Sequence, residues 1–240
     1  LAAADSVLEC EGSCQIQQCH LTSPLAEADR ELGTLGLDGV VWVLPTLSAY
    51  PVVERLKATG MPVVAVTIGP MPRDVSCFTI DYEKDSYRVA KLMLAENRRR
   101  IFALLSREEE LREKTLAGVE RAYQEAGLEF DRSFSLVHSE KEPELLERML
   151  PIIKPDGIIA GCDILDSVKA AGLDIVDECR LYAHSFNASE TRGFVGFIGE
   201  PRRTPALAEN LLAQINVPET APVVHGCLDF KLYKTGEREG

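Results

Sequence analysis

Short apolar runs alternate with longer amphipathic segments along most of this chain. The apolar runs at residues 40–44, 63–66, 101–105 and 158–160 have the length and composition of buried strands. Further strands are expected at 14–19, 77–80, 134–138, 181–184 and 223–232. In the stretches between these runs, apolar residues recur at the three- and four-residue spacing of helices packed on one face.

One helix is predicted to begin at Leu1, and others are predicted at residues 25–35, 50–59, 142–150, 164–171 and 205–215. Two longer helices are also predicted, one that begins at Tyr82 and one that ends at Ala126. Gly60, Gly127 and Gly172 follow predicted helices, where glycine most easily ends them. Strands that alternate with helices indicate parallel sheets, and two such runs predict two doubly wound α/β lobes.

Composition narrows the class of protein. The 240 residues carry a net charge of −12, and such an acidic body does not bind nucleic acid non-specifically. No stretch approaches the ~18 consecutive apolar residues that suggest a membrane span. The seven cysteines are scattered and odd in number, which argues against a secreted disulfide framework. Residues 1–5 lack the basic start and apolar core of a signal peptide, so a cytoplasmic protein is expected.

Several motifs together resemble those of lactose-repressor-type (LacI/GalR) transcriptional regulators. In that family a Val-Asp-Asn turn leads into a helix that closes with Gly-His-Arg-Arg-Ile before a strand. Here Ile80-Asp81-Tyr82 begins the helix and Asn97-Arg98-Arg99-Arg100-Ile101 closes it, so the Gly and His are replaced. The other similar segments are residues 37–43, 60–66, 116–119 with 126–128, 155–160 with Asp163, and 200–201 with 208–212. They follow the family's order over nearly all of the chain after about Gln15.

The resemblance implies the effector-binding and dimerisation core of a LacI-type regulator. Its fold would be periplasmic binding protein type I-like, with two doubly wound parallel-sheet lobes and an interlobe cleft. The expected N-terminal lobe is residues 1–98, the C-terminal lobe 99–188, a return to the N-terminal lobe 189–216, and a last crossing 217–240. The family's first strand and helix-turn-helix headpiece are expected upstream of Leu1, and a homodimer would reach operator DNA only through that headpiece.

Candidate ligand-binding residues follow the expected strand ends, because open α/β sheets bind ligands outside the carboxyl ends of their strands. That rule nominates residues 20–23, 45–48, 67–69, 106–112, 138–139, 162–163 and 184–187, and so Ser23 and Thr46. By the resemblance, the family's ligand-gripping Arg is Thr115 here, with Arg112 one turn earlier; its Asn-Asp pair is Cys162-Asp163, and its turn Asp is Asn187. Asp163 could instead only cap a helix, and Arg112 could be a solvated surface charge.

Other chemistries find little support in the sequence. Cys10, Cys14, Cys19 and His20 match no familiar zinc spacing, so neither a metal nor a cofactor is expected. The glycine-rich nucleotide loops and the Gly-x-Ser-x-Gly elbow are missing, which disfavours an enzyme. The alternative is a periplasmic sugar-binding protein of a transport system, which shares the fold. The expected effector is a small, sugar-like molecule.

Overall fold

The chain forms two compact units, each built from separate parts of the sequence. The computed structural model describes residues 27–43, 49–67, 71–105, 109–137, 143–161, 165–173, 180–184, 196–201, 205–228 and 230–234. Unit 1 comprises Leu1–Ile80 and Arg202–Asp229, and unit 2 comprises Asp81–Pro201 and Phe230–Gly240. The chain therefore passes between the units three times. No helix in these ranges is both long and apolar enough to cross a membrane.

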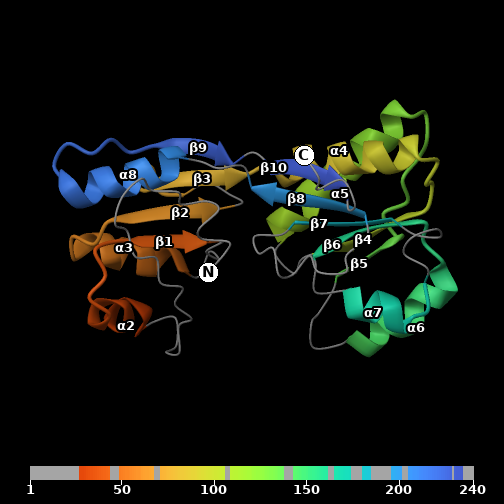
Figure 1. Ribbon diagram of the computed structural model, residues 1–240, viewed down its shortest axis with the longest axis horizontal. Coiled ribbons are helices and arrows are strands. Elements are labelled where there is room, and N and C mark those ends of the chain that lie inside the picture. Colours follow the sequence, from red (N-terminus) through yellow and green to blue (C-terminus); the bar gives the residue numbers. More distant parts are fainter. Residues whose placement is uncertain are drawn as a thin grey trace. The chain divides into compact units, whose positions relative to one another are not determined.

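Unit 1 is a parallel sheet with helices on both faces (Figure 1). Its elements are α2 (Ala28–Thr34), β1 (Val40–Val43), α3 (Tyr50–Ala58), β2 (Val63–Thr67), β3 (Ser76–Ile80), α8 (Pro205–Asn216) and β9 (His225–Leu228). The strands pair in the order β1-β2-β3-β9, every pair parallel. All five residues of β2 are buried, as in a strand covered on both sides.

Neighbouring residues of β3 show which helices cover which face of this sheet. Cys77 joins the cluster that contains Val53 and Leu56 of α3 and Leu32 of α2. The preceding residue, Ser76, instead accepts a hydrogen bond from Gln214 of α8 (3.3 Å). Because successive strand residues point to opposite faces, α2 and α3 cover one face and α8 the other.

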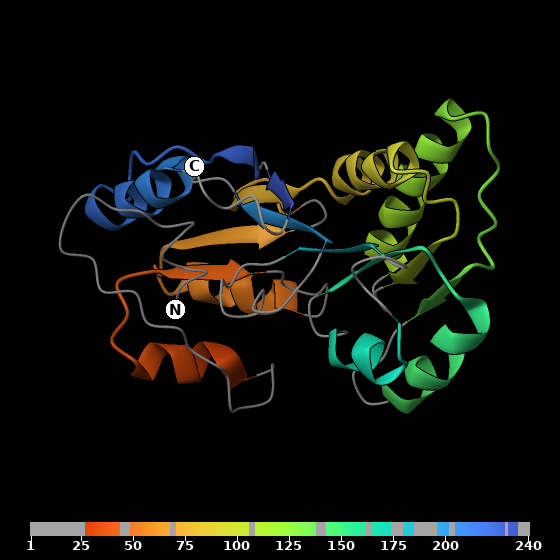
Figure 2. The same cartoon turned by 45° about the vertical axis from the view of Figure 1, so that its right-hand side comes forward.

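Unit 2 is a larger mixed sheet. Its elements are α4 (Tyr82–Ala95), β4 (Ile101–Leu105), α5 (Glu109–Glu125), β5 (Ser135–Val137), α6 (Pro143–Ile153), β6 (Gly157–Gly161), α7 (Leu165–Ala170), β7 (Arg180–His184), β8 (Gly196–Pro201) and β10 (Phe230–Lys234). The strands follow the order β10-β8-β7-β6-β4-β5, and only β10 runs antiparallel to its neighbour among them. Figure 2 shows α4 and α5 packed together.

The central strand β4 packs on different helices through its two faces. Ile101 clusters with residues of α4 and α5, and Ala103 and Leu105 cluster with Leu116 of α5. Phe102 and Leu104 cluster with residues of α6 and α7. The continuous apolar run that predicts a buried strand is therefore explained by helices on both sides.

The arginine-rich segment after α4 stabilises the end of another helix. Basic residues that follow a helix usually favour the C-terminal dipole of that helix, but α4 has no basic residue in its last turn. Arg100 instead donates to the backbone oxygens of Ile153 and Lys154, at the end of α6. The Asp156 carboxylate accepts the Arg99 and Arg100 amides at 2.9 and 2.7 Å. A cation thus caps a helix C-terminus, but the helix is α6.

Asn97 ends α4 in the left-handed conformation, with φ of 64°. The amides of Asn97 and Arg98 donate to the Leu94 and Met93 carbonyls, which is the Schellman pattern. Glycine adopts this conformation without strain, whereas the Cβ of alanine comes too close to the following carbonyl oxygen. We expect Asn97→Gly to raise the free energy of unfolding by about 0.5 kcal/mol and Asn97→Ala to lower it by about 1 kcal/mol. Urea unfolding of both variants measures this, and equal shifts would contradict it.

The structure divides the chain at positions other than those expected. The first crossing falls between Ile80 and Asp81, not after residue 98, because α4 packs against α5 in unit 2. The later crossings fall at 201/202 and 229/230 instead of 188/189 and 216/217. Strand β8 was not predicted, and the expected extended segment 223–232 consists of two strands, one in each unit. The helix at Leu1 and the strand at 14–19 lie outside the described residues.

Candidate functional site

The candidate ligand site lies at the edge of the unit 2 sheet where its parallel strands have their carboxyl ends. Strands β4, β6 and β7 are parallel neighbours, so Leu105, Gly161 and His184 end them at the same edge. Helix α5 follows β4 and packs on the face of Ala103 and Leu105. Helix α7 follows β6, and its Val168 packs on the opposite face with Phe102 and Leu104.

Adjacent strands that send their following helices to opposite faces define a topological switch point. Between β4 and β6 the two connections diverge, and open α/β sheets bind ligands in the crevice that this divergence leaves. The segments that leave the two strands contain residues 106–108 and 162–164. The sequence candidates Arg112 and Thr115 belong to the helix on one side, and Cys162 and Asp163 to the connection on the other.

Arg112 and Thr115 lie three residues apart in the N-terminal half of α5, and therefore near one another on the helix surface. The Thr115 side chain is turned inward: the residue is 9% exposed and its hydroxyl donates to the Leu111 carbonyl at 2.9 Å. Arg112 keeps a partly exposed guanidinium, whose Nε lies 3.8 Å from a Glu113 carboxylate oxygen. That ion pair is long and surface-exposed, so it holds Arg112 weakly. Of the two, Arg112 is the better candidate to reach a ligand.

The other sequence candidates fall in parts of the chain that the structure does not describe. These are Ser23, Thr46, Cys162, Asp163 and Asn187, together with Cys10, Cys14, Cys19 and His20 of the rejected metal pattern. In the sequence, Asp163 falls between two described elements: β6 ends at Gly161, and α7 begins at Leu165. Within the described ranges, no group of three or more His, Cys, Asp or Glu side chains is arranged to hold a metal ion.

A group of polar residues in α4 was missed from the sequence. Asp85 is 2% exposed, and its carboxylate lies 3.4 Å from Arg88 Nη1. Burial, and then the neighbouring Asp85 charge, raise the pKa of Tyr82, so this phenol stays protonated. One signal in the sequence pointed to the group: Asp85 stands four and eight residues before the buried Val89 and Met93, on their helix stripe.

Known structures of regulators share this fold. The transcriptional regulator CcpA of Lactococcus lactis matches with a TM-score of 0.69 and 14% identity, over 88% of this chain and 81% of that one. A LacI family regulator from Enterococcus faecium, solved with bound ribose, matches with 0.65 and 15%, over 89% and 84%. The regulator CelR in complex with cellobiose matches with 0.66 and 18%, over 87% and 68%. The sequence matches no protein-family model and no curated protein.

These likenesses confirm the expected α/β architecture with two sheets, which is the periplasmic binding protein type I-like fold of LacI-type regulator cores. The resemblance inferred from the ordered motifs is thereby confirmed at the level of fold, over about nine tenths of the chain. At identities of 14–18%, these likenesses show the fold alone.

Proposed function

We propose that this chain is the effector-binding and dimerisation core of a cytoplasmic LacI-type transcriptional regulator, and that it catalyses no reaction. The observation that carries the proposal is the switch point between β4 and β6, within a fold shared with regulators over 87–89% of this chain. DNA binding is assigned to a helix-turn-helix headpiece outside these residues, since the net charge of −12 disfavours phosphate contacts by the core.

The proposed effector is a sugar or a related polyhydroxylated metabolite. Two of the similar regulators were solved with cellobiose and with ribose. In this chain, the Asp163 carboxylate, after β6, can accept hydrogen bonds from hydroxyl groups. The Arg112 guanidinium, on α5 at the other side of the switch point, can donate several hydrogen bonds. Asn187, which follows β7, adds an amide that can donate and accept.

Isothermal titration calorimetry of the chain against cellobiose, ribose and a panel of other mono- and disaccharides tests the proposal. We expect saturable one-to-one binding of at least one of these sugars, with a rise in melting temperature that grows with ligand concentration. Failure of the whole panel to bind, or to shift the melting temperature, would count against a sugar effector.

Asp163 is the residue whose replacement should affect this binding most. Losing a charged hydrogen-bond acceptor in a partly dry site costs about 1.5–3 kcal/mol, so we expect Asp163→Asn to weaken sugar binding about ten- to a hundredfold. The melting temperature should stay nearly constant, because Asn caps a helix about as well as Asp. Affinity and melting temperature are measured in parallel. Unchanged affinity would mean that Asp163 only caps α7.

The proposed homodimer has a candidate contact surface on α6. The most exposed of the large apolar residues that the structure describes is Ile152, at 80%. Leu145, 47% exposed, and the half-buried Met149 lie on the same helical stripe, seven and three residues earlier. We call these three residues the α6 stripe. An apolar stripe of this kind is stabilised when a second copy of the chain covers it.

Removing the most exposed member of the α6 stripe should therefore weaken the dimer. We expect Ile152→Ala to raise the dimer Kd about tenfold, because burial of an isoleucine side chain contributes about 1.5–3 kcal/mol. Sedimentation equilibrium measures this. Val217→Ala is the matched control, since Val217 is also exposed, at 53%, but lies apart from α6 in the sequence and in unit 1. An equal Kd for both variants would exclude the α6 stripe from the interface.

A further inference from the structure

The three crossings of the chain reach unit 2 on α4, β8 and β10. The first crossing enters at Asp81, the N-cap of α4, and the second leaves after Pro201, the last residue of β8. The third returns at Phe230, the first residue of β10. Strands β8 and β10 lie side by side (Figure 1), and their ladder places Phe230 opposite Pro201. The ends of the second and third crossings are thus direct neighbours.

Arg88 connects α4 to this pair of strands. Its Nη1 donates to the backbone oxygen of Phe230 at 3.1 Å and lies 3.4 Å from Asp85 Oδ1. Phe230 is 1% exposed, so its carbonyl needs a donor inside the protein. Its ladder partner Pro201 has no backbone N–H and cannot supply one. The guanidinium of Arg88 is such a donor, and it comes from α4 and not from the sheet.

Asp85 explains why Arg88 stays in place. The Asp85 side chain is 4% exposed, whereas that of Arg88 is 35% exposed and could otherwise turn into solvent. A buried carboxylate needs a cation nearby, because an uncompensated charge inside a protein is strongly unfavourable. The pair lies three residues apart on one helix face, so Asp85 holds the guanidinium over Phe230.

We propose that Arg88 is a positioning residue that joins the unit 2 ends of the three crossings into one rigid piece, with Asp85 as its support. We call Asp85, Arg88, Pro201 and Phe230 the crossing anchor. Any movement of one unit against the other must pass through these crossings. The crossing anchor makes the unit 2 ends move together, and this follows from the division into two units whatever ligand the chain binds.

Hydrogen–deuterium exchange of the whole chain, with and without Arg88→Met, tests the proposal. Methionine keeps much of the aliphatic stem and removes every donor. We expect amide exchange in residues 230–234 to become about tenfold faster, with unchanged exchange in residues 101–105 of the central strand β4. Lys114→Met is the matched control, because it breaks an ion pair of 2.9 Å with Glu110 on α5, within the same unit but away from the crossings. It should leave exchange in residues 230–234 unchanged.

A second readout and a second variant separate positioning from general stability. Spin labels incorporated at Glu54 and Glu144, which are exposed residues of units 1 and 2, report the spread of distances between the units. Arg88→Met should broaden that distribution. The double variant Asp85→Asn, Arg88→Met also removes the charge of the buried Asp85, and should fold and show the same broadening. Unchanged exchange at 230–234, equal acceleration at 101–105, or an unchanged distance distribution would each overturn the proposal.

Discussion

Replacing Gly118 with alanine will lower the free energy of unfolding of unit 2 by about 3 kcal/mol, at the upper end of the usual cost of overpacking. Gly118 lies in the middle of α5, where that helix packs against α4 (Figure 2). A Cβ at this position would stand 2.3 Å from the Glu83 carbonyl oxygen and 2.8 Å from the Tyr87 nitrogen. Both are backbone atoms, so no side chain can turn aside and the two helices must separate.

Separation of α4 and α5 would disturb the core that they share. Val89 and Met93 of α4 and Val119 and Ala122 of α5 belong to one buried cluster with Ile101 of β4. Interiors of proteins are close-packed, and a local shift of two helices therefore loses many dispersion contacts at once. Chemical denaturation followed by far-ultraviolet circular dichroism, together with exchange of the α4 and α5 amides, measures the loss.

Gly33→Ala is the matched control for Gly118→Ala. Gly33 also lies inside a helix, α2, but no heavy atom comes within 4 Å of a Cβ placed there. Without a steric cost, alanine should raise the free energy of unfolding by up to about 1 kcal/mol through helix propensity. Opposite signs for the two variants would establish the close contact at Gly118. A loss below about 1 kcal/mol at Gly118 would show that the helices adjust easily.

The described strands show how far apolar patterning predicts a fold. Runs such as residues 101–105 and 63–66 were placed correctly, because β4 and β2 are buried along their whole length and these runs contain apolar residues only. Strand β8 was missed because Gly196 and Gly199 interrupt its apolar pattern and Pro201 ends it. The first crossing was misplaced for another reason. Helix α4 follows a unit 1 strand directly, and only its tertiary packing on α5 shows that it belongs to unit 2.

The candidate site was only partly accessible to sequence reasoning. The strand-end rule nominated residues 106–112, which include Arg112, and the structure leaves the Arg112 guanidinium partly exposed. Thr115 was nominated by resemblance alone, and its hydroxyl is bonded to its own helix. The role of Arg88 was not predictable, because its partner Phe230 lies 142 residues away and is contacted through a backbone oxygen. Such contacts leave no pattern in side-chain types.

In unit 1, Asn210→Ala should lower the free energy of unfolding by about 2–3 kcal/mol, because each unsatisfied buried polar group costs about 1–3 kcal/mol. Asn210 is 5% exposed; its amide donates to the Pro222 carbonyl at 2.8 Å and accepts from Gln214 at 2.9 Å. Gln214 in turn binds the Ser76 hydroxyl and the Val63 amide. These bonds join α8 to β2, to β3 and to the segment that leads into β9.

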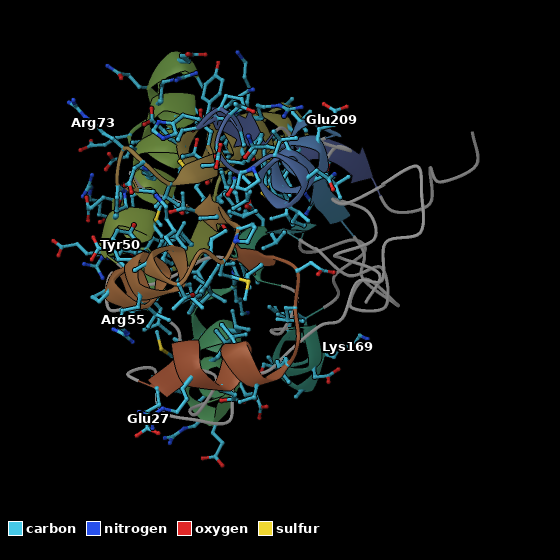
Figure 3. All side chains as sticks on the ribbon, turned by 90° about the vertical axis from the view of Figure 1, so that its left-hand side faces the viewer. Glu27, Tyr50, Arg55, Arg73, Lys169 and Glu209 are labelled. Carbon is cyan, nitrogen blue, oxygen red and sulfur yellow. The ribbon has the colours of Figure 1, made fainter. Side chains whose placement is uncertain are left out.

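The fluorescence of Trp42, the single tryptophan, reports this loss directly, because Trp42 belongs to β1 of the same unit. Asn210→Leu separates the two contributions: it restores the lost volume but not the hydrogen bonds, so it should be destabilised nearly as much as Asn210→Ala. The neighbouring Glu209 is exposed on α8 and points away from the sheet (Figure 3), so Glu209→Ala should change stability by less than about 0.5 kcal/mol. If Asn210→Leu were as stable as the original chain, packing and not the polar network would hold α8 on its sheet.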